Sequence, residues 1–152
     1  MFKNICFIGL PYSGKSYLGN KLFRIMNKGF IDTDNIIKSV YNKDLKDIIN
    51  KYGNEHFLDI EESAVKSVIA DNIILSTGGS VVYRQNSINH IKNNLNSDII
   101  YLYITYPEFK KRITNFNNRG IIIGPDQSLK HFYDERCSLY EKYSDYRIDF
   151  NS

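Results

Sequence analysis

The stretch that decides the fold is Gly9-Leu10-Pro11-Tyr12-Ser13-Gly14-Lys15-Ser16, which follows directly on the apolar start of the chain. It fits the phosphate-binding pattern G-x-x-x-x-G-K-[ST]. Its two glycines allow successive backbone N–H groups to point at phosphate oxygens. Its lysine places a charge near the β and γ phosphates, and its serine hydroxyl is a ligand type that Mg²⁺ accepts. An apolar strand before the motif and an amphipathic helix after it complete the required context, so we predict a nucleotide-phosphate site here.

Segments typical of strands and of helices alternate along the rest of the chain. The predicted strands are residues 2–10, 29–32, 72–76, 98–105 and 147–150, and the predicted helices are residues 16–26, 35–41, 44–51, 57–69, 86–93, 107–117 and 128–143. Such alternation predicts a three-layer α/β/α fold in which helices cover both faces of a mostly parallel, five-stranded sheet. A length of 152 residues suits one domain, so we expect a single domain over residues 1–152.

Composition excludes several other classes of protein. The apolar fraction of 42% is ordinary for a globular chain, and a net charge of +3 does not indicate a nucleic-acid partner. No apolar run approaches the roughly 18 residues of a membrane span. The only cysteines, Cys6 and Cys137, lack metal-site spacing and fit a reducing compartment. We therefore expect a cytoplasmic protein without a nucleic-acid or membrane partner.

Two carboxylates follow the second predicted strand, in the run Phe30-Ile31-Asp32-Thr33-Asp34. Ligands gather at the carboxyl ends of parallel strands, so both side chains are expected near the phosphate loop. Asp32 is a candidate for the water shell of a metal ion, and Asp34 for orienting or deprotonating a substrate hydroxyl. The alternative is that Asp34 only caps the following helix.

At this point the chain resembles the shikimate kinase family, which has a P-loop fold like that of nucleoside monophosphate kinases. The resemblance extends over residues 3–149. Besides the phosphate loop and the acidic pair, the matching positions are Gly53, Phe57 and Glu61, Thr77-Gly78-Gly79, Arg112, Arg119, Glu135-Arg136, Leu139-Tyr140 and Ser144-Asp145. The resemblance implies transfer of the γ-phosphate of ATP to a hydroxyl of shikimate, with Mg²⁺ as cofactor. It also implies a lid at about residues 112–126 and a monomer or weak dimer.

The resemblance assigns roles to individual residues. The catalytic residues implied are Lys15, Asp34 and Arg119. The nucleotide-binding residues implied are Gly9, Pro11, Tyr12, Ser13, Gly14, Lys15, Ser16, Tyr17, Arg112 and Arg119. The acceptor-binding residues implied are Asp34, Leu58, Gly78, Gly79, Ser80 and Arg136, and the metal residues are Ser16 and Asp32. Arg136 would grip the carboxylate of the acceptor, because a guanidinium presents a bidentate fork.

Four departures from the family pattern leave the identity of the phosphate acceptor open. Leu58 stands where the family has an arginine that helps to hold the carboxylate, and Arg84 is the nearest uncommitted cation in the sequence. Ser80 replaces the third glycine of the substrate loop, and Gly120 replaces the proline of the lid. The chain also stops at Ser152, so we expect one face of the sheet to be thinly covered or covered by a partner.

These departures leave two alternatives to shikimate kinase activity. The first is a kinase of the same fold that acts on another small hydroxylated acceptor, such as gluconate or homoserine. The second is a nucleotide-binding protein with impaired catalysis.

Overall fold

The computed structural model describes residues 3–113 and 121–151, and its centre is a five-stranded sheet in the order β2-β3-β1-β4-β5. All the neighbouring strands described are parallel. The strands are β1 (Asn4–Ile8), β2 (Gly29–Asp32), β3 (Ile73–Ser76), β4 (Ser97–Tyr103) and β5 (Tyr146–Asp149). The predicted fold class is therefore confirmed. The prediction was a mostly parallel sheet, and all the described strand pairs are parallel.

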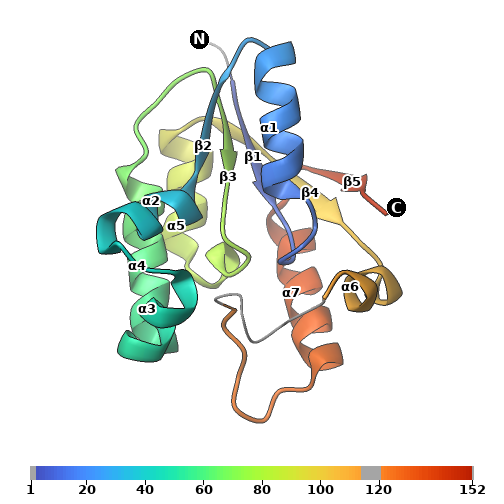
Figure 1. The fold of residues 1–152 in the computed structure, drawn as a ribbon. Coiled ribbons are helices and arrows are strands. Elements are labelled where there is room, and N and C mark those ends of the chain that lie inside the picture. The colour runs from blue at the N-terminus through green and yellow to red at the C-terminus, as the bar shows by residue number, and fades with distance from the viewer. Residues whose placement is uncertain (1–2, 114–120, 152) are drawn as a thin grey trace.

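Helices cover both faces of this sheet and extend beyond its β2 edge (Figure 1). They are α1 (Lys15–Ile25), α2 (Thr33–Tyr41), α3 (Leu45–Tyr52), α4 (Asn54–Ser67), α5 (Gln85–Asn89), α6 (Tyr106–Arg112) and α7 (Leu129–Tyr143), with a short 3₁₀ turn η1 (Val81–Tyr83) and a π turn η2 (His90–Asn94). In Figure 1, α1 lies in front of the sheet and α5 and α7 lie behind it.

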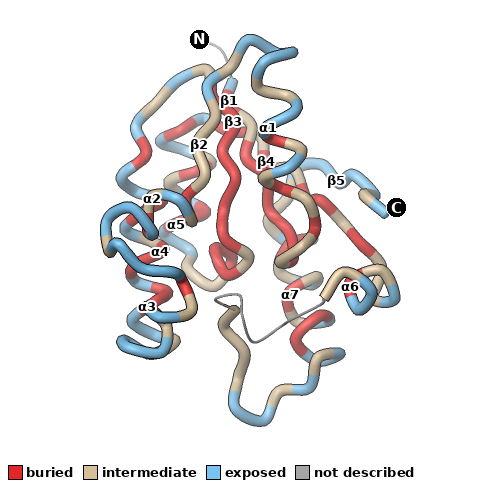
Figure 2. The backbone as a smooth tube through the Cα atoms, in the orientation of Figure 1, coloured by how far each residue is buried: buried red, intermediate tan, exposed pale blue. Residues whose placement is uncertain are grey.

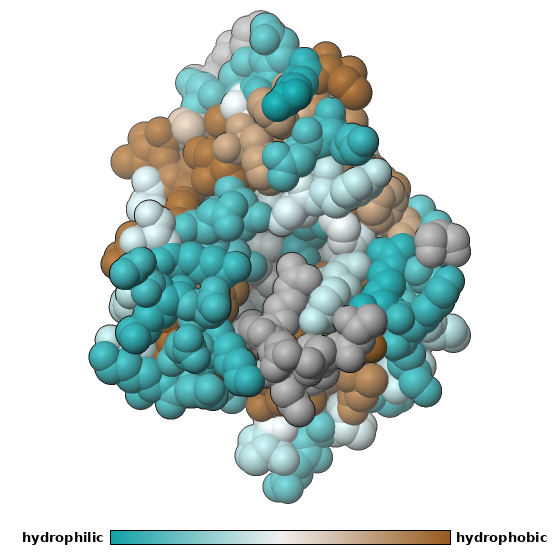
Figure 3. All heavy atoms as spheres, in the orientation of Figure 1, coloured by the Kyte–Doolittle hydropathy of each residue, from teal (hydrophilic) through white to brown (hydrophobic). Residues whose placement is uncertain are grey.

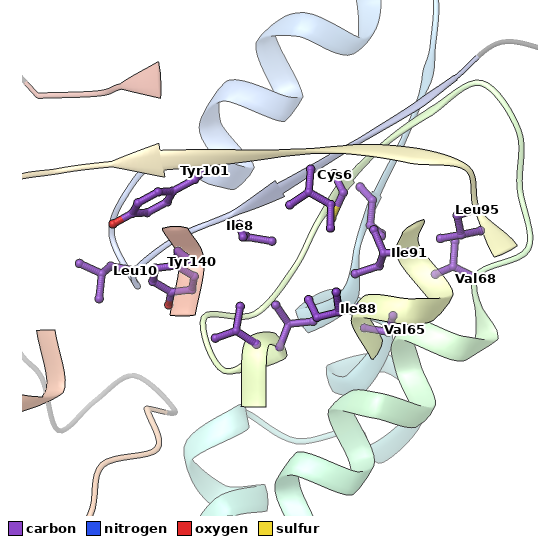
Figure 4. Packing of buried hydrophobic residues seen from close by; sticks show 14 of the residues in the cluster. Cys6, Ile8, Leu10, Val65, Val68, Ile88, Ile91, Leu95, Tyr101 and Tyr140 are labelled. Carbon is purple, nitrogen blue, oxygen red and sulfur yellow. The ribbon is translucent and has the colours of Figure 1, made fainter. Parts of the chain in front are cut away.

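Alternation along β1 divides the core between the two faces. Successive side chains of a strand point to opposite faces, so Cys6 and Ile8 enter one cluster and Phe7 enters the other. The larger cluster lies under α4, α5 and α7, and Figure 4 shows part of it. The smaller cluster lies under α1. Figure 2 shows the central strands as the most continuously buried part of the chain, which makes them a rigid base for the loops at their carboxyl ends.

A separate small core joins α2, α3 and α4. Its buried members include Ile37, Ile48, Phe57 and Ile60, which recur at helical spacing on the inner sides of the three helices. The outer sides are polar, and Figure 3 shows a predominantly hydrophilic surface over α2 and α3. This three-helix unit forms one wall of the site described below.

The three largest differences between the predicted and the observed elements concern helices. Helix α4 begins at Asn54 rather than at residue 57. The helix predicted at 86–93 is divided between α5 and the π turn η2. The helix predicted at 107–117 ends at Arg112 within the residues described. The first and third differences lie at element ends, where local propensity is a weak guide, and the second lies inside the predicted helix.

Strand β5 forms one edge of the sheet and is exposed to solvent along its length. All four residues of β5 are exposed, among them Tyr146 at 61% and Ile148 at 41%.

Among the described residues, no helix has the length and apolar character needed to cross a membrane.

Candidate active site

The phosphate loop predicted from sequence joins β1 to α1 at the carboxyl edge of the sheet (Figure 1). Gly9 has φ +151° and Gly14 has φ +99°, both of which favour glycine. A Cβ on Gly9 would lie 2.7 Å from the carbonyl oxygen of Leu102, and a Cβ on Gly14 would lie 2.5 Å from the Phe150 ring. The loop therefore has no room for a side chain at either position.

Lys15 lies inside this loop. Its side chain is largely buried, and Nζ donates to the carbonyl oxygens of Gly9 and Leu10 at 2.8 Å each. Lys15 also begins α1, whose first turn contains no acidic residue. A helix N-terminus carries a partial positive charge and unpaired N–H donors. Together with the lysine, it makes the loop an anion site of the kind that holds nucleotide phosphates.

Ser16 and Asp32, the two predicted metal residues, are in contact. Ser16 Oγ donates to Asp32 Oδ2 at 2.5 Å and lies 3.3 Å from Ser76 Oγ. The other carboxylate oxygen of Asp32 accepts from the backbone N–H of Asp34 at 2.9 Å and caps α2. The helix cap that was considered for Asp34 is thus made by the side chain of Asp32.

Arg112, at the end of α6, joins three segments of the site. Its Nε pairs with Glu108 Oε1 at 2.7 Å, Nη1 donates to the Tyr12 carbonyl oxygen at 3.2 Å, and Nη2 donates to the Phe150 carbonyl oxygen at 2.8 Å. The guanidinium therefore holds the phosphate loop against the segment that follows β5.

Replacing Arg112 with alanine should weaken both the fold and nucleotide binding. Loss of these charge-assisted hydrogen bonds should lower the free energy of unfolding by about 1–3 kcal/mol and raise the KM for ATP. Urea unfolding and ATP titration of the steady-state rate measure the two effects. The exposed neighbour Lys110 supplies the control, Lys110→Ala. An Arg112→Ala variant with the KM and stability of the unmodified protein would show that the clamp is energetically unimportant.

A pocket of about 450 Å³ opens beside the phosphate loop, a volume suited to a small ligand. The predicted site residues that line it are Pro11, Tyr12, Gly14, Lys15, Ser16, Tyr17, Asp34, Gly78, Gly79, Ser80, Arg112 and Arg136. In Figure 1 the carboxyl ends of β1, β2 and β3 converge between α2–α4 on one side and α7 on the other. The pocket thus joins residues from distant parts of the chain.

Arg136 of α7 is the buried cation of this pocket, with 1% of its surface exposed. Its guanidinium lies 4.2 Å from the centre of the Phe132 ring, and Nη2 donates to the Ile122 carbonyl oxygen at 2.6 Å. Its Nε has no hydrogen-bond partner, and no carboxylate pairs with it among residues 3–113 and 121–151. A buried cation that forms no ion pair favours binding of an anionic ligand.

Glu61 of α4 is a pocket residue that was not among the predicted site residues. It is 2% exposed, and its Oε1 accepts from Ser80 Oγ at 2.8 Å. Burial raises the pKa of Glu61 to about 7, and the charge of Asp34 acts in the same direction. The Ser80 hydrogen bond and the charges of Arg136 and Lys15 lower it in part. The sequence did contain a signal for this residue, because Glu61 lies between Ile60 and Ala64 on the inner side of an amphipathic helix.

The remaining predicted residues lie elsewhere. Leu58 is buried but does not line this pocket; it borders a neighbouring depression that includes Tyr83 and Ile122. Arg84 does not reach the pocket, because it pairs with Glu55 and Asp59 at 3.1 Å and 3.0 Å.

Three predicted residues do not line the pocket but contact residues that do or that belong to the loop, and a fourth lies in the part of the chain that is not described. Gly9 packs against Ser13 in the loop, and Asp32 bonds to Ser16 and to the backbone of Asp34. Arg119 and the central part of the predicted lid lie outside the described residues. The described lid residues Ile121 and Ile122 line the pocket.

Comparison with known proteins identifies the family. A family model described as shikimate kinase matches residues 11–152. The chain belongs to the shikimate kinase family. A shikimate kinase of Thermoanaerobacter pseudethanolicus is 32% identical over 97% of this chain and 86% of its own. The structure of the shikimate kinase of Aquifex aeolicus is similar with a TM-score of 0.83, at 25% identity over 98% of this chain and 88% of its own.

The fold of this shikimate kinase family member matches most of the length of solved relatives. The structure of the Acinetobacter baumannii shikimate kinase in complex with shikimate is similar with a TM-score of 0.88, at 23% identity. The match includes all of this chain and 86% of the Acinetobacter baumannii chain. The predicted family and the predicted ATP-dependent transfer of a phosphoryl group to a hydroxyl are therefore confirmed.

Proposed function

We propose that the pocket transfers the γ-phosphate of ATP to a hydroxyl of shikimate. The observation that carries the proposal is the placement of Arg136 and Asp34 on the walls of one pocket beside the phosphate loop. Arg136 is a buried, unpaired cation suited to a carboxylate, and Asp34 is an acceptor suited to a hydroxyl. The names of the relatives and the shikimate bound by the Acinetobacter baumannii enzyme support this acceptor.

ATP is assigned to the phosphate-loop side of the pocket. The backbone N–H groups between Gly9 and Lys15 and the N-terminus of α1 would hold the β and γ phosphates. Tyr12, Tyr17 and Arg112 border the open end of the pocket, where the nucleoside would lie. Lys15 would leave its loop carbonyl partners to neutralise charge on the transferred group.

Mg²⁺ fits the pair formed by Ser16 and Asp32. Magnesium usually keeps several waters and takes one or two protein oxygens together with the phosphates of the substrate. A serine hydroxyl and a carboxylate in contact supply that donor set at the mouth of the loop. The ion would supply positive charge to the phosphates when bound.

Asp34 is assigned as the base for the acceptor hydroxyl. Its carboxylate lies beside the backbone of Gly78, where a Cβ would come within 2.9 Å of Oδ1. The adjacent Gly79 lies against Arg136 and Pro11. The backbone of the two glycines thus separates the hydroxyl end of the pocket from the carboxylate end, while Ser80 adds a hydroxyl that is committed to Glu61.

We propose that the segment at about 112–126, with Arg119, acts as a lid over the reacting groups. Within that segment, Ile122 already lies on the pocket, and Asn54 Nδ2 donates to the Ile123 carbonyl oxygen at 3.3 Å. A closed apolar cover would exclude water and limit hydrolysis of ATP. We further propose that residues 1–152 act as one kinase domain, monomeric or weakly dimeric, in the cytoplasm, with no nucleic-acid partner.

A coupled assay of ADP release tests the acceptor. The purified protein is given Mg-ATP with shikimate, gluconate, homoserine or no acceptor. Turnover with millimolar shikimate or less supports the proposal. Turnover only with another compound would identify that compound as the acceptor in place of shikimate. Intact ATP binding without any turnover would indicate impaired catalysis. The alternatives raised by the sequence are therefore separated by one panel.

A further inference from the structure

Glu61 is the buried acid of the pocket that the mechanism above does not use. Its Oε1 accepts from Ser80, and its Oε2 faces the backbone of Gly78 so closely that a Cβ there would collide with it. The same Cβ would lie 2.9 Å from Asp34 Oδ1. The two carboxyl groups, from α4 and α2, therefore converge on one point of the glycine loop.

Within the residues that the structure describes, the charged groups that act on Glu61 come from three other elements. Asp34 on α2 is negative, Lys15 on α1 is positive, and Arg136 on α7 is positive. Neither cation lies within ion-pair distance of Glu61 in the described part of the chain. One turn before Glu61, the helix carries Leu58, which offers no charge. A second buried anion beside Asp34 is thus only partly compensated.

This arrangement has a consequence for the acceptor. If Glu61 is ionised, it adds a second buried negative charge beside Asp34 and opposes the entry of an anionic acceptor next to Arg136. If Glu61 is a neutral acid, this repulsion is absent. Electrostatic attraction at short range in a buried pocket depends strongly on such a single charge.

On the basis of the proposed function, we propose that Glu61 is a positioning residue that carries a proton in the acceptor-binding form of the enzyme. The proton resides on Oε2, because Oε1 is occupied by the Ser80 hydroxyl hydrogen. Its release to bulk water leaves a carboxylate that competes with the acceptor for Arg136. Acceptor binding should therefore weaken as pH rises through the titration of Glu61, while ATP binding at the phosphate loop should not.

A buried glutamate that serves only the fold would give a different result. It would accept the Ser80 hydrogen bond and stabilise the glycine loop, but it would not couple shikimate binding to pH. The two roles are separated by the pH profile of the KM, since a structural role would change stability or all kinetic constants together.

The experiment compares the unmodified enzyme with Glu61→Gln from pH 6 to 9. Shikimate remains ionised over this range, so a change reports on the protein. In the unmodified enzyme the KM for shikimate should rise above about pH 7, approaching roughly tenfold per pH unit. Glu61→Gln, which cannot ionise, should have a KM that is flat with pH. The KM for ATP should stay constant in both.

Two further variants sharpen this comparison. Glu62→Gln is the matched control, because Glu62 is adjacent on α4 but pairs with Lys66 away from the pocket, and its profile should equal that of the unmodified enzyme. Ser80→Ala removes the hydroxyl that stabilises the ionised form of Glu61. The rise in KM should then begin at a higher pH. A Glu61→Gln variant that keeps the original rise, or a Ser80→Ala profile that moves to lower pH, would overturn the proposal.

A spectroscopic titration makes the test independent of turnover. Carbon-13 NMR of the glutamate carboxyl groups, with the Glu61 signal assigned by its loss in Glu61→Gln, should give a midpoint near pH 7. A midpoint near the ordinary value of about 4.3 would refute the inference even if shikimate is phosphorylated. If instead shikimate is not phosphorylated at any pH, the proposed function itself fails, so the two failures are distinguishable.

Discussion

Replacing Asp34 with asparagine should lower kcat for shikimate about 100- to 10,000-fold, the usual range for losing a general base. Asparagine preserves the size of the side chain but cannot take a proton from the acceptor hydroxyl. The helix cap should survive, because it is made by the side chain of Asp32 to the backbone N–H of Asp34. The KM for ATP should therefore change little, and the loss should be confined to the chemical step.

The coupled ADP-release assay measures this effect under saturating ATP and shikimate. The matched control is Asp44→Asn, since Asp44 precedes α3, is exposed and makes no side-chain capping bond. Its kcat should equal that of the unmodified enzyme. A kcat reduced less than about tenfold in Asp34→Asn would mean that Asp34 only orients the hydroxyl and that another group accepts the proton.

Arg136→Met should raise the KM for shikimate about 10- to 150-fold, with the KM for ATP nearly unchanged. The physical reason is the loss of a charge-assisted pair, whose contribution is about 1.5–3 kcal/mol. Methionine can occupy the space against the Phe132 ring, where the guanidinium lies now, so the variant should fold. Arg136→Lys keeps the charge but loses the planar fork. Its KM for shikimate should lie between those of the unmodified enzyme and Arg136→Met.

Arg84→Met supplies the control for this series. It removes the same charge from a residue that pairs on the surface with Glu55 and Asp59. The KM for shikimate should be unaffected by it, because Arg84 does not line the pocket. If Arg84→Met raised the KM as much as Arg136→Met does, the acceptor carboxylate would have to be bound outside the pocket described.

Much of the fold was predictable because its signals are local. The phosphate loop was predicted as a unit, since its glycines, its lysine and the flanking strand and helix are contiguous in sequence. The strand at Gly29–Asp32 was predicted with its observed limits. Errors lie at element ends and in the segment of α5 and η2, where a π turn interrupts a helix that periodicity alone would continue.

The acceptor side of the site was less predictable, because its signals are relations between distant residues. Leu58 was expected to line the acceptor pocket, but the turn of α4 places it over the neighbouring depression. Arg84 looked uncommitted in the sequence, yet two carboxylates on α4 neutralise it. Glu61 is one helical turn from Leu58, and only the packing of α4 against the glycine loop shows that it faces Asp34.

The sequence by itself determined that a nucleotide phosphate is bound, because the loop from Gly9 to Ser16 carries its own geometry and charge within eight consecutive positions. Only the tertiary structure decided the acceptor side. It brought Asp34, Glu61 and Arg136 from three helices to one pocket and buried two of them there. Burial and the nearby charge of Asp34 raise the pKa of Glu61, and neither burial nor proximity is a property of any single stretch of the chain.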